Sequence, residues 1–208
     1  MDLVNTQTNS GVQLFAGDFP RVTKAITILT GLVLALGTLL GKILLGAATA
    51  AAKSGGNTGD GVFTIDATTP ILAYAKAGIY TVRCIAAAAN GGTFRVTDPY
   101  GNVLGDVAVG STFANQIKFV IADGTTDFIV GDGFDVTIAA GSGKYKAYNA
   151  DNVDGSQYPE LVLAEAVDSS GGDVKSVGLA SGHFNEAAIT GIDANAKAYL
   201  VGKPLFFS

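Results

Sequence analysis

The sequence predicts a mainly β protein, and three observations support this class. About seven or eight short apolar runs between Val62 and Ile138 are separated by turn signals, a pattern typical of a β-sandwich. Glycine occurs 28 times among the 208 residues and punctuates these runs. The longest uncharged segment, Ala25–Gly41, contains glycines that weaken helices and β-branched residues that alternate with period two.

Residues 1–22 are predicted to form an extended N-terminal arm. Asn, Thr and Ser dominate its first half, and large apolar residues follow. One interpretation is a frayed terminus, and the other is a segment that orders on a partner by adding a strand to its sheet. In the second interpretation the contact residues are Leu14, Phe15, Phe19, Pro20 and Val22.

The uncharged segment Ala25–Gly41 has three possible structures. Its 17 residues reach the lower limit for a membrane span, and a buried or amphipathic helix is a second possibility. Gly31, Gly37 and the alternating Ile26-Thr27-Ile28 favour strand–turn–strand instead. We therefore expect an apolar hairpin and no membrane partner, with a membrane or pore-forming protein as the alternative.

The middle of the chain is predicted to be an Ig-like β-sandwich domain over residues 54–142. Two Gly-rich stretches, Gly46–Gly61 and Ala139–Lys146, are predicted linkers on either side. Tight turns are expected where Asn or Asp stands beside Gly or Pro, because these residues favour turn conformations. The turn signals are Asn90-Gly91-Gly92, Asp98-Pro99-Tyr100-Gly101, Asp123-Gly124 and Gly131-Asp132-Gly133.

The C-terminal part is predicted to combine strands with a short helix. Leu161–Val167 is apolar and Val174–Leu179 alternates, so both are expected to be strands. Phe184–Ile189 is expected to start a short helix with Asn185 as its N-cap, which Asn195–Tyr199 continues. The apolar tail Pro204–Phe207 needs burial.

Composition narrows the functions that are available. The net charge of −5 argues against a nucleic-acid partner, because phosphate binding needs clustered Lys and Arg. A single cysteine, Cys84, excludes a disulfide framework and a cysteine-based zinc site, and we expect it to be a buried, inert thiol. The single histidine, His183, has Ser181 and Glu186 nearby in the sequence, but no nucleophile elbow surrounds the serine, so we expect a turn or interface histidine.

Four acidic residues of the middle segment provide a candidate metal site. Asp123, Asp127, Asp132 and Asp135 would bind a divalent cation only if their loops converged, and turn formation beside glycine accounts for most of them. We therefore expect no enzymatic activity, no cofactor, and no catalytic, metal-binding or cofactor-binding residues.

Read together without the middle, the two flanks resemble the lambda-type phage head decoration (capsid-stabilising) proteins. The matching elements are Leu163–Val177, Gly182–Ile189, Ala16–Ile28 and the Gly37–Lys42 spacing. The resemblance implies a clip-like, β-rich decoration domain with short helical segments, formed by residues 23–46 and 144–208. It further implies homotrimers on the outer surface of the virion capsid, made in the host cytoplasm, that bind the major capsid protein and stabilise the head.

Two features extend or depart from this resemblance. The middle segment is similar to a β-sandwich module of phage structural proteins, and its alternative function is adsorption to host-surface glycans through Tyr74, Tyr80 or Tyr100. The family usually places polar residues in the turn after the first strand. Here the turn is apolar, so we expect it to be an interface with the capsid or a neighbouring subunit. Its residues are Leu32, Val33, Leu34 and Leu36.

Overall fold

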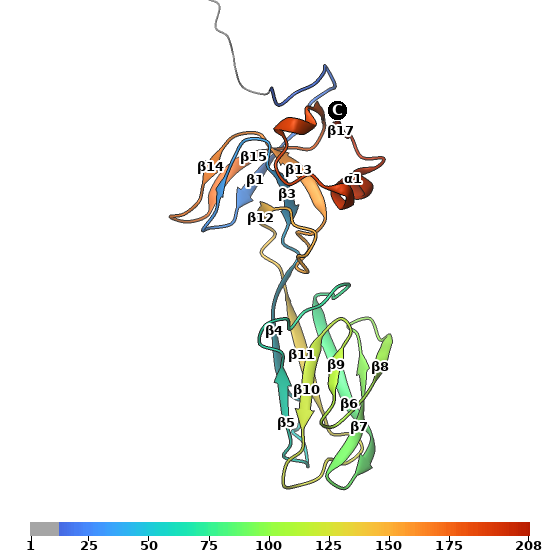
Figure 1. The fold of residues 1–208 in the computed structure, drawn as a ribbon. Helices are drawn as coiled ribbons and strands as arrows, with labels where there is room; N and C mark the ends of the chain where they lie inside the picture. The colour runs from blue at the N-terminus through green and yellow to red at the C-terminus, as the bar shows by residue number, and fades with distance from the viewer. Residues whose placement is uncertain (1–12) are drawn as a thin grey trace, which may run out of the picture. The chain divides into compact units, whose positions relative to one another are not determined.

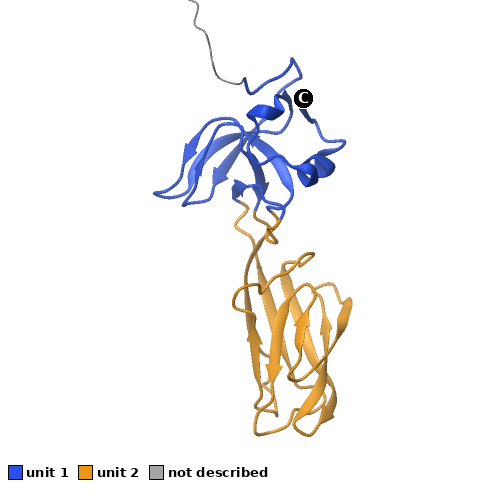
Figure 2. Cartoon of the chain, in the orientation of Figure 1, with its two compact units in different colours: residues 1–42, 144–150, 156–208 blue, residues 43–143, 151–155 orange. Residues whose placement is uncertain are grey.

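The computed structural model describes residues 13–208 and confirms the mainly β class (Figure 1). The chain divides into two compact units (Figure 2). Unit 1 contains the described residues up to Lys42 together with residues 144–150 and 156–208. Unit 2 contains residues 43–143 and 151–155.

Unit 1 is built around a closed five-stranded barrel in the order β1-β12-β3-β13-β15. The barrel strands are β1 (Thr23–Ile28), β3 (Leu39–Lys42), β12 (Tyr145–Ala147), β13 (Pro159–Leu163) and β15 (Val174–Leu179). Two small sheets accompany it, β2 (Val33–Leu34) with β14 (Val167–Asp168), and β16 (Gly182–Phe184) with β17 (Leu205–Phe207).

The Ala25–Gly41 segment forms strands, as predicted, but the predicted hairpin is wrong. β1 pairs along its whole length with β15, from Thr23↔Leu179 to Ile28↔Val174, and β12 separates it from β3 in the barrel. The connection from β1 to β3 contains β2, which pairs with β14. A connection that includes a strand of another sheet is too long for the tight turn of a hairpin. Within residues 13–208 no helix has the length and apolar character of a membrane span.

Successive residues of β3 supply two different cores of unit 1. Leu39 and Leu40 are both fully buried, because neighbouring side chains point to opposite faces of a strand and both faces are covered here. Leu40 packs with Ile28 and Leu161, whereas Leu39 packs in a second cluster that includes Phe184. Strand β3, which lies in the Gly37–Lys42 match, thus contributes to both cores of unit 1.

Two glycines in the Gly37–Lys42 match stand where the backbone approaches another segment closely. A Cβ on Gly37 would collide with the carbonyl oxygen of Ala188, and Gly37 also has a positive φ of 82°. A Cβ on Gly41 would collide with the backbone of Ser156. Glycine is therefore required at both positions for steric reasons.

The short helix after β16 is confirmed, with a correction to its extent. Asn185 caps it by accepting a hydrogen bond from the Ala187 amide at 3.1 Å, but it is a 3₁₀ helix limited to Glu186–Ala188. The α-helix α1 (Ala194–Leu200) is separate and has its own cap, Asp193, so the predicted continuation is wrong. The break falls where Gly191 adopts a positive φ of 87°.

Unit 2 is a sandwich of a five-stranded sheet, β4-β11-β6-β7-β8, and a three-stranded sheet, β5-β10-β9. The strands are β4 (Leu45–Ala52), β5 (Val62–Ile65), β6 (Gly78–Ala88), β7 (Gly91–Thr97), β8 (Val103–Ala108), β9 (Thr112–Ala114), β10 (Lys118–Ala122) and β11 (Gly133–Ala140). Its core is aromatic, with Phe63 and Phe119 stacked at 4.4 Å and Phe94 edge-on to Phe128 at 5.0 Å.

The turns of unit 2 follow the sequence prediction, but the linkers do not. Asn90 has a positive φ of 52° between β6 and β7, and the turn that starts at Asp98 joins β7 to β8. The first half of the predicted linker Gly46–Gly61 is instead strand β4, paired with β11. Ala139–Lys146 likewise holds the end of β11 and the start of β12. Backbone pairing with β11 overrides the weak strand propensity of the alanines in β4.

Asp132 ties three backbone segments of unit 2 together. It is 3% exposed, and its carboxylate accepts hydrogen bonds from the amides of Thr58 (2.9 Å), Gly59 (3.0 Å) and Ile129 (3.1 Å). Burial opposes ionisation, but these bonds outweigh it and hold the pKa of Asp132 below its ordinary value of 3.8.

Asp132→Asn is expected to destabilise unit 2 by about 1–3 kcal/mol at pH 7, because an amide cannot accept all three bonds. A lowered folded-state pKa stabilises the fold above the unfolded-state pKa, and this contribution disappears as the pH falls through the folded-state value. Urea unfolding of both proteins should therefore show a difference that shrinks below about pH 4. Equal stabilities at pH 7 would contradict this role.

Candidate functional site

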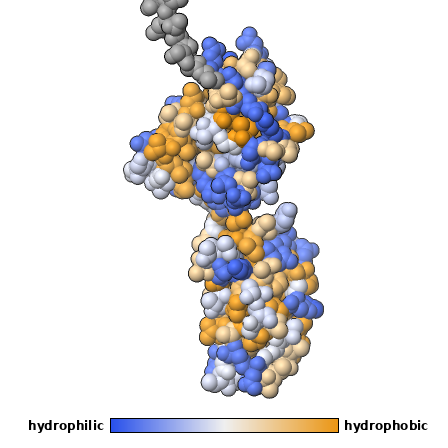
Figure 3. Space-filling model, in the orientation of Figure 1, coloured by the Kyte–Doolittle hydropathy of each residue, from blue (hydrophilic) through white to orange (hydrophobic). Residues whose placement is uncertain are grey.

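Unit 1 exposes two apolar surfaces at places where the sequence predicts contacts. The first, here called the terminal face, joins the N-terminal segment to the last strand. Its exposed residues are Phe19, Pro20, Arg21 and Val22 with Phe206 of β17. The second, here called the loop surface, consists of Val33 and Leu36 between β1 and β3. Figure 3 shows hydrophobic side chains at the surface on the β1–β14 side of unit 1.

The predicted arm is folded against its own unit from Leu14 onward. The Ala16 amide donates to the His183 carbonyl at 3.0 Å, and the Asn185 amide donates to the Leu14 carbonyl at 2.9 Å. Together with a bridge between Phe15 and Phe184, these bonds run the segment antiparallel to β16. β17 occupies the other edge of β16, so both ends of the described chain meet there (Figure 1).

The arm contains both core residues and surface residues. Leu14 and Phe15 are partly buried against the second core of unit 1. Further along, the Ser181 hydroxyl donates to the Pro20 carbonyl at 2.7 Å and accepts from the Val22 amide at 2.8 Å. Of the five predicted contact residues, therefore, Phe19, Pro20 and Val22 remain exposed, and Leu14 and Phe15 hold the segment in place.

Aromatic rings and cations occur together on and beside the terminal face. The rings of Phe19 and Phe206 meet edge-on at 4.8 Å, and the Arg21 guanidinium lies 3.7 Å from the centre of the Phe15 ring. Exposed fractions of 37% for Phe19 and 46% for Phe206 leave part of both rings open to solvent. Exposed aromatic residues beside arginine are typical of the centres of protein–protein interfaces.

The four apolar residues predicted in the turn divide between core and surface. Leu34 is buried and Leu32 packs against the barrel core, whereas Val33 is 75% exposed and Leu36 is 47% exposed. This division follows from strand β2, in which Val33 points outward and Leu34 inward. The structure thus leaves two of the four residues available to a partner.

A buried serine that the sequence reasoning did not single out fixes the loop surface. Ser169 is fully buried, and its hydroxyl accepts from the Leu32 amide at 3.0 Å and lies 2.7 Å from the Leu29 carbonyl oxygen, to which it donates. Its own amide donates to the Leu32 carbonyl at 2.7 Å. The turn sequence Asp168–Asp173 could have pointed to Ser169, because it lies within Leu163–Val177, one of the segments that carry the family resemblance.

Two carboxylates flank the loop surface. A hydrogen bond from the Ser170 hydroxyl lowers the pKa of Asp168, and the Lys144 ammonium lowers the pKa of Asp173. Asp173 also accepts from the Thr30 amide at 3.0 Å. Both carboxylates are therefore ionised at neutral pH. Lys144 compensates the charge of Asp173, whereas Asp168 places a negative charge opposite Val33.

Three of the four candidate metal residues serve separate structural contacts, whereas one carboxylate oxygen of the fourth, Asp123, is buried without a hydrogen-bond partner among the described residues. Asp132 binds backbone amides, Asp135 pairs with Arg83 at 2.5 Å, and Asp127 accepts from the Asn90 amide at 2.8 Å. Within residues 13–208, no group of three or more His, Cys, Asp or Glu side chains is arranged to hold a metal ion.

His183 and Cys84 have structural surroundings. The His183 Nε2 atom lies 2.9 Å from the Ser208 hydroxyl oxygen, between the two chain ends of unit 1. Cys84 is buried, as predicted, and burial raises the pKa of its thiol.

The three tyrosines proposed for glycan contact differ in exposure. Tyr80 is fully buried, and its hydroxyl donates to Gln116 at 2.8 Å, so it cannot contact a glycan. Tyr74 and Tyr100 are exposed on unit 2, and the Lys76 ammonium lies 4.6 Å from the centre of the Tyr100 ring.

Comparisons with known proteins give one strong match. The model of the family described as bacteriophage lambda head decoration protein D matches residues 2–201. A search of the curated proteins found no match. Two crystal structures of Xanthomonas campestris FlgL, in space groups H3 and C2, show 22% identity and a TM-score of 0.33. These matches cover 53% of this chain and 34% and 33% of the FlgL chains, so the chain spans about a third of FlgL.

Proposed function

Because the chain belongs to the bacteriophage lambda head decoration protein D family, we propose that it binds the outer surface of the head as a homotrimer and stabilises the shell. Membership makes it a phage head decoration protein, a structural protein of the virion that binds the capsid. The observation that carries the proposal is the family match over residues 2–201, which includes both residues of the loop surface and the N-terminal residues of the terminal face, but not Phe206.

The terminal face is the proposed contact with the major capsid protein. Phe19, Pro20 and Val22 are exposed although the backbone around them is hydrogen-bonded to Ser181. A preorganised apolar surface loses little conformational entropy on binding, so more of its contact energy appears as affinity. Adding the arm as a strand to a capsid sheet remains part of the proposal.

The loop surface is the proposed contact between subunits. Val33 and Leu36 are too exposed to contribute much to the stability of a single chain, and Ser169 holds the loop in one conformation. Three copies around an axis would cover these residues. A trimer then presents three terminal faces to the shell, and linked weak contacts give a combined affinity far above that of one.

Heads that lack the protein provide the direct test. Adding the purified chain should give saturable binding, and loaded heads should retain their DNA at temperatures at which bare heads release it. The same chain unfolded and held in denaturant until mixing is the control for nonspecific adhesion. Absence of binding, or binding that leaves DNA release unchanged, would contradict the proposal.

Unit 2 is proposed to be an insertion that head binding does not need. Lys42 at the end of β3 pairs with Tyr145 of β12, so the two residues are direct cross-strand neighbours within unit 1. Two-residue Asn-Gly turns join such neighbours in hairpins. We expect that Asn-Gly can replace residues 43–144 if Val153, which packs against the core of unit 2, is changed to Ser.

The shortened chain is expected to fold, to form trimers and to bind heads with an affinity within a few-fold of the full chain. Analytical ultracentrifugation and a head-binding titration measure these properties. A shortened chain that folds but no longer binds heads would show that unit 2 takes part in capsid contact.

Exposed tyrosines on unit 2 support a second candidate function, adsorption to host-surface glycans. Tyr74 is 79% exposed and has a positive φ of 64°, an unusual conformation for a residue with a side chain. Virions that carry the shortened chain test this function. Their adsorption to host cells should fall while their heads stay intact, and unchanged adsorption would contradict it.

A further inference from the structure

Strand β4 of unit 2 has one edge without a partner strand. It is the outer strand of the five-stranded sheet, so β11 covers one of its edges and no strand of residues 13–208 covers the other (Figure 1). At the end of β4 the Lys53 amide donates to the Gly133 carbonyl of β11 at 2.9 Å. Because backbone groups point to alternate sides along a strand, every second residue back from Ala52 directs its amide and carbonyl away from β11. These residues are Ala52, Ala50 and Ala48.

The outward backbone groups of these three alanines are accessible. No other segment of the described chain forms a hydrogen bond with any of them, and Ala50 and Ala52 are exposed. The start of β4 is covered instead, because the Asp154 carbonyl accepts from the Leu44 amide at 2.7 Å and from the Leu45 amide at 2.9 Å. The open part of the edge therefore runs from Ala48 to Ala52.

The other edge strands of unit 2 have features that discourage pairing with another chain. β8 carries Asp106, has Gly105 at a positive φ of 147°, and shifts its register with β7 between Val96 and Thr97. β5 and β9 have only four and three residues. Charge, irregular register and short length are common protections of an edge. β4 has eight residues and no charge, and its own register shift lies before the open part.

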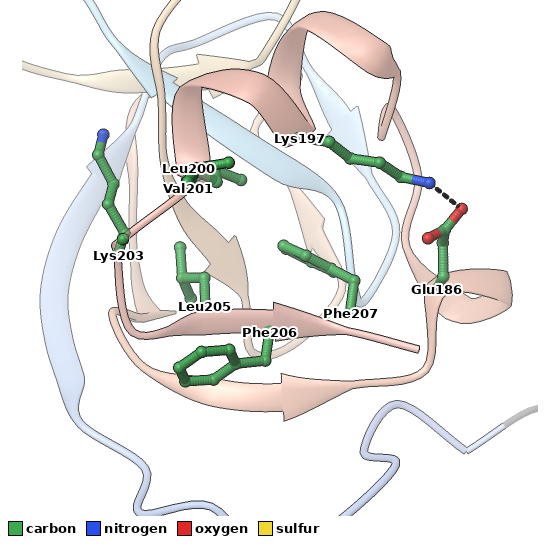
Figure 4. Close-up of a pocket in the computed structure, with 9 residues that line it drawn as sticks. Glu186, Lys197, Leu200, Val201, Lys203, Leu205, Phe206 and Phe207 are labelled. Carbon is green, nitrogen blue, oxygen red and sulfur yellow. Dashed lines mark hydrogen bonds and ion pairs between the residues drawn. The ribbon is translucent and has the colours of Figure 1, made fainter.

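Unit 1 has no edge of this kind among the described residues. Its main sheet is a closed barrel, and strands β2 and β14 have two residues each. β17 has three residues and lies beside helix α1, whose Lys197 pairs with Glu186 at 2.6 Å (Figure 4). Within residues 13–208, β4 is therefore the edge strand that is both long and uncharged.

We propose that β4 pairs with β4 of a second copy of the chain, antiparallel and around a two-fold axis, so that two five-stranded sheets join. A contact between identical surfaces is weakened wherever like charges meet. The chain has a net charge of −5, but β4 carries none, so two copies can approach here without repulsion between the paired strands. A second copy also brings an open edge of its own, so one contact pairs both edges. On a head this contact would link neighbouring copies through unit 2, which goes beyond the proposed function of unit 1.

The proposed pairing predicts which residues of the two strands face each other. The outward residues Ala48, Ala50 and Ala52 pair with the same three residues of the partner strand, so the two-fold axis lies near Ala50. Thr49 is exposed and then lies close to its own counterpart. Its neighbour on β11 is Thr137, which is uncharged. A charge introduced at position 49 therefore acts on the contact between copies more than on the sheet itself.

Sedimentation of the full chain over a range of concentrations tests this contact. The chain carries Val33→Lys, so that the proposed trimer does not obscure a dimer, and we expect monomers at low concentration and dimers as the concentration rises. Hydrogen exchange at the amides of Ala48, Ala50 and Ala52 should slow over the same range, because pairing protects these donors. A chain that stays monomeric, or a dimer without this protection, would overturn the inference. If Val33→Lys leaves a trimer, the proposed subunit contact fails, and the protection of the three amides still decides the inference.

Two positions test the backbone and the charge separately. Ala50→Pro removes an amide that points away from β11, so the sheet keeps its own hydrogen bonds while dimerisation should weaken by about tenfold or more. Thr49→Lys and Thr49→Glu should each weaken dimerisation several-fold. An equimolar mixture of these two variants should restore it, since opposite charges then face each other across the contact.

Val103→Lys is the matched control, because Val103 is 58% exposed on β8, at the opposite edge of the same sheet. It should dimerise as the parent chain does, and the thermal midpoints of all variants should agree. If Ala50→Pro lowers the thermal midpoint, the mixture of the Thr49 variants decides alone. Equal dimerisation of Ala50→Pro and Val103→Lys, or a mixture no stronger than either Thr49 variant, would show that another surface forms the dimer.

Discussion

Val33→Lys is expected to convert the proposed trimer into monomers and to weaken head binding by about a hundredfold or more, the gain that linked contacts supply. Val33 is 75% exposed and lies directly opposite Asp168 in the β2–β14 pair. A lysine there can pair with Asp168 within the same chain, so folding should survive. Covering three lysine side chains, paired or not, in a subunit contact carries a desolvation cost that valine does not. Sedimentation gives the oligomeric state, and titration of heads gives the affinity.

Val33→Ile is the control for this result. It keeps the exposed apolar surface and should leave the trimer and the head affinity as they are. A Val33→Lys protein that remains trimeric would show that the loop surface is not the subunit contact. A monomeric protein that retains full affinity would show instead that binding does not depend on three linked contacts.

Phe184→Ala is expected to destabilise unit 1 by about 3–5 kcal/mol, the usual cost of removing a buried phenylalanine side chain. Phe184 is fully buried on β16, between Phe15 of the arm at 5.6 Å and Phe207 of β17 at 5.8 Å. Its loss removes the packing that holds the described part of the arm and the last strand, so head binding should fall as well. Urea unfolding should show a lower midpoint for unit 1, while unit 2, which has its own core, keeps its transition.

The neighbouring residue is the matched control for Phe184. His183→Ala removes a half-buried side chain whose one described hydrogen bond is to the Ser208 hydroxyl, and loss of one such bond costs about 1 kcal/mol, well below the cost at Phe184. If Phe184→Ala were as mild as His183→Ala, the arm and the last strand would not share a core. The proposed terminal face would then lack the rigidity on which its affinity depends.

Local signals predicted much of the fold because they depend on one or a few residues. Asn90 closes the β6–β7 hairpin with a positive φ, which asparagine tolerates better than most residues. Asn185 caps a helical turn because its short side chain reaches the Ala187 amide. Gly37 and Gly41, which carry part of the family resemblance, are fixed by collisions that any larger residue would cause.

The errors concern strand partners, which local patterns do not specify. β1 pairs with β15, about 150 positions later in the chain, because together they complete a closed barrel around Ile28 and Leu161. No feature of Ala25–Gly41 encodes that partner. The alanines of β4 likewise form a strand only because their backbone pairs with the edge of β11 that β6 leaves unpaired.

The candidate contact residues were predicted only in part, because local patterns do not specify which side chains face inward. Apolar character located the arm and the loop, but it could not show that Leu14 and Leu34 face inward while Phe19 and Val33 face solvent. The open edge of β4 was missed, because Gly46–Gly61 was predicted to be a linker, and the edge exists only once β4 pairs with β11.

Electron cryomicroscopy of heads saturated with the protein tests the central claim most directly. We expect density outside the shell in clusters of three at three-fold positions, with the terminal face of each unit 1 against the capsid. Density inside the shell, single copies away from three-fold positions, or a terminal face turned to solvent would contradict the account.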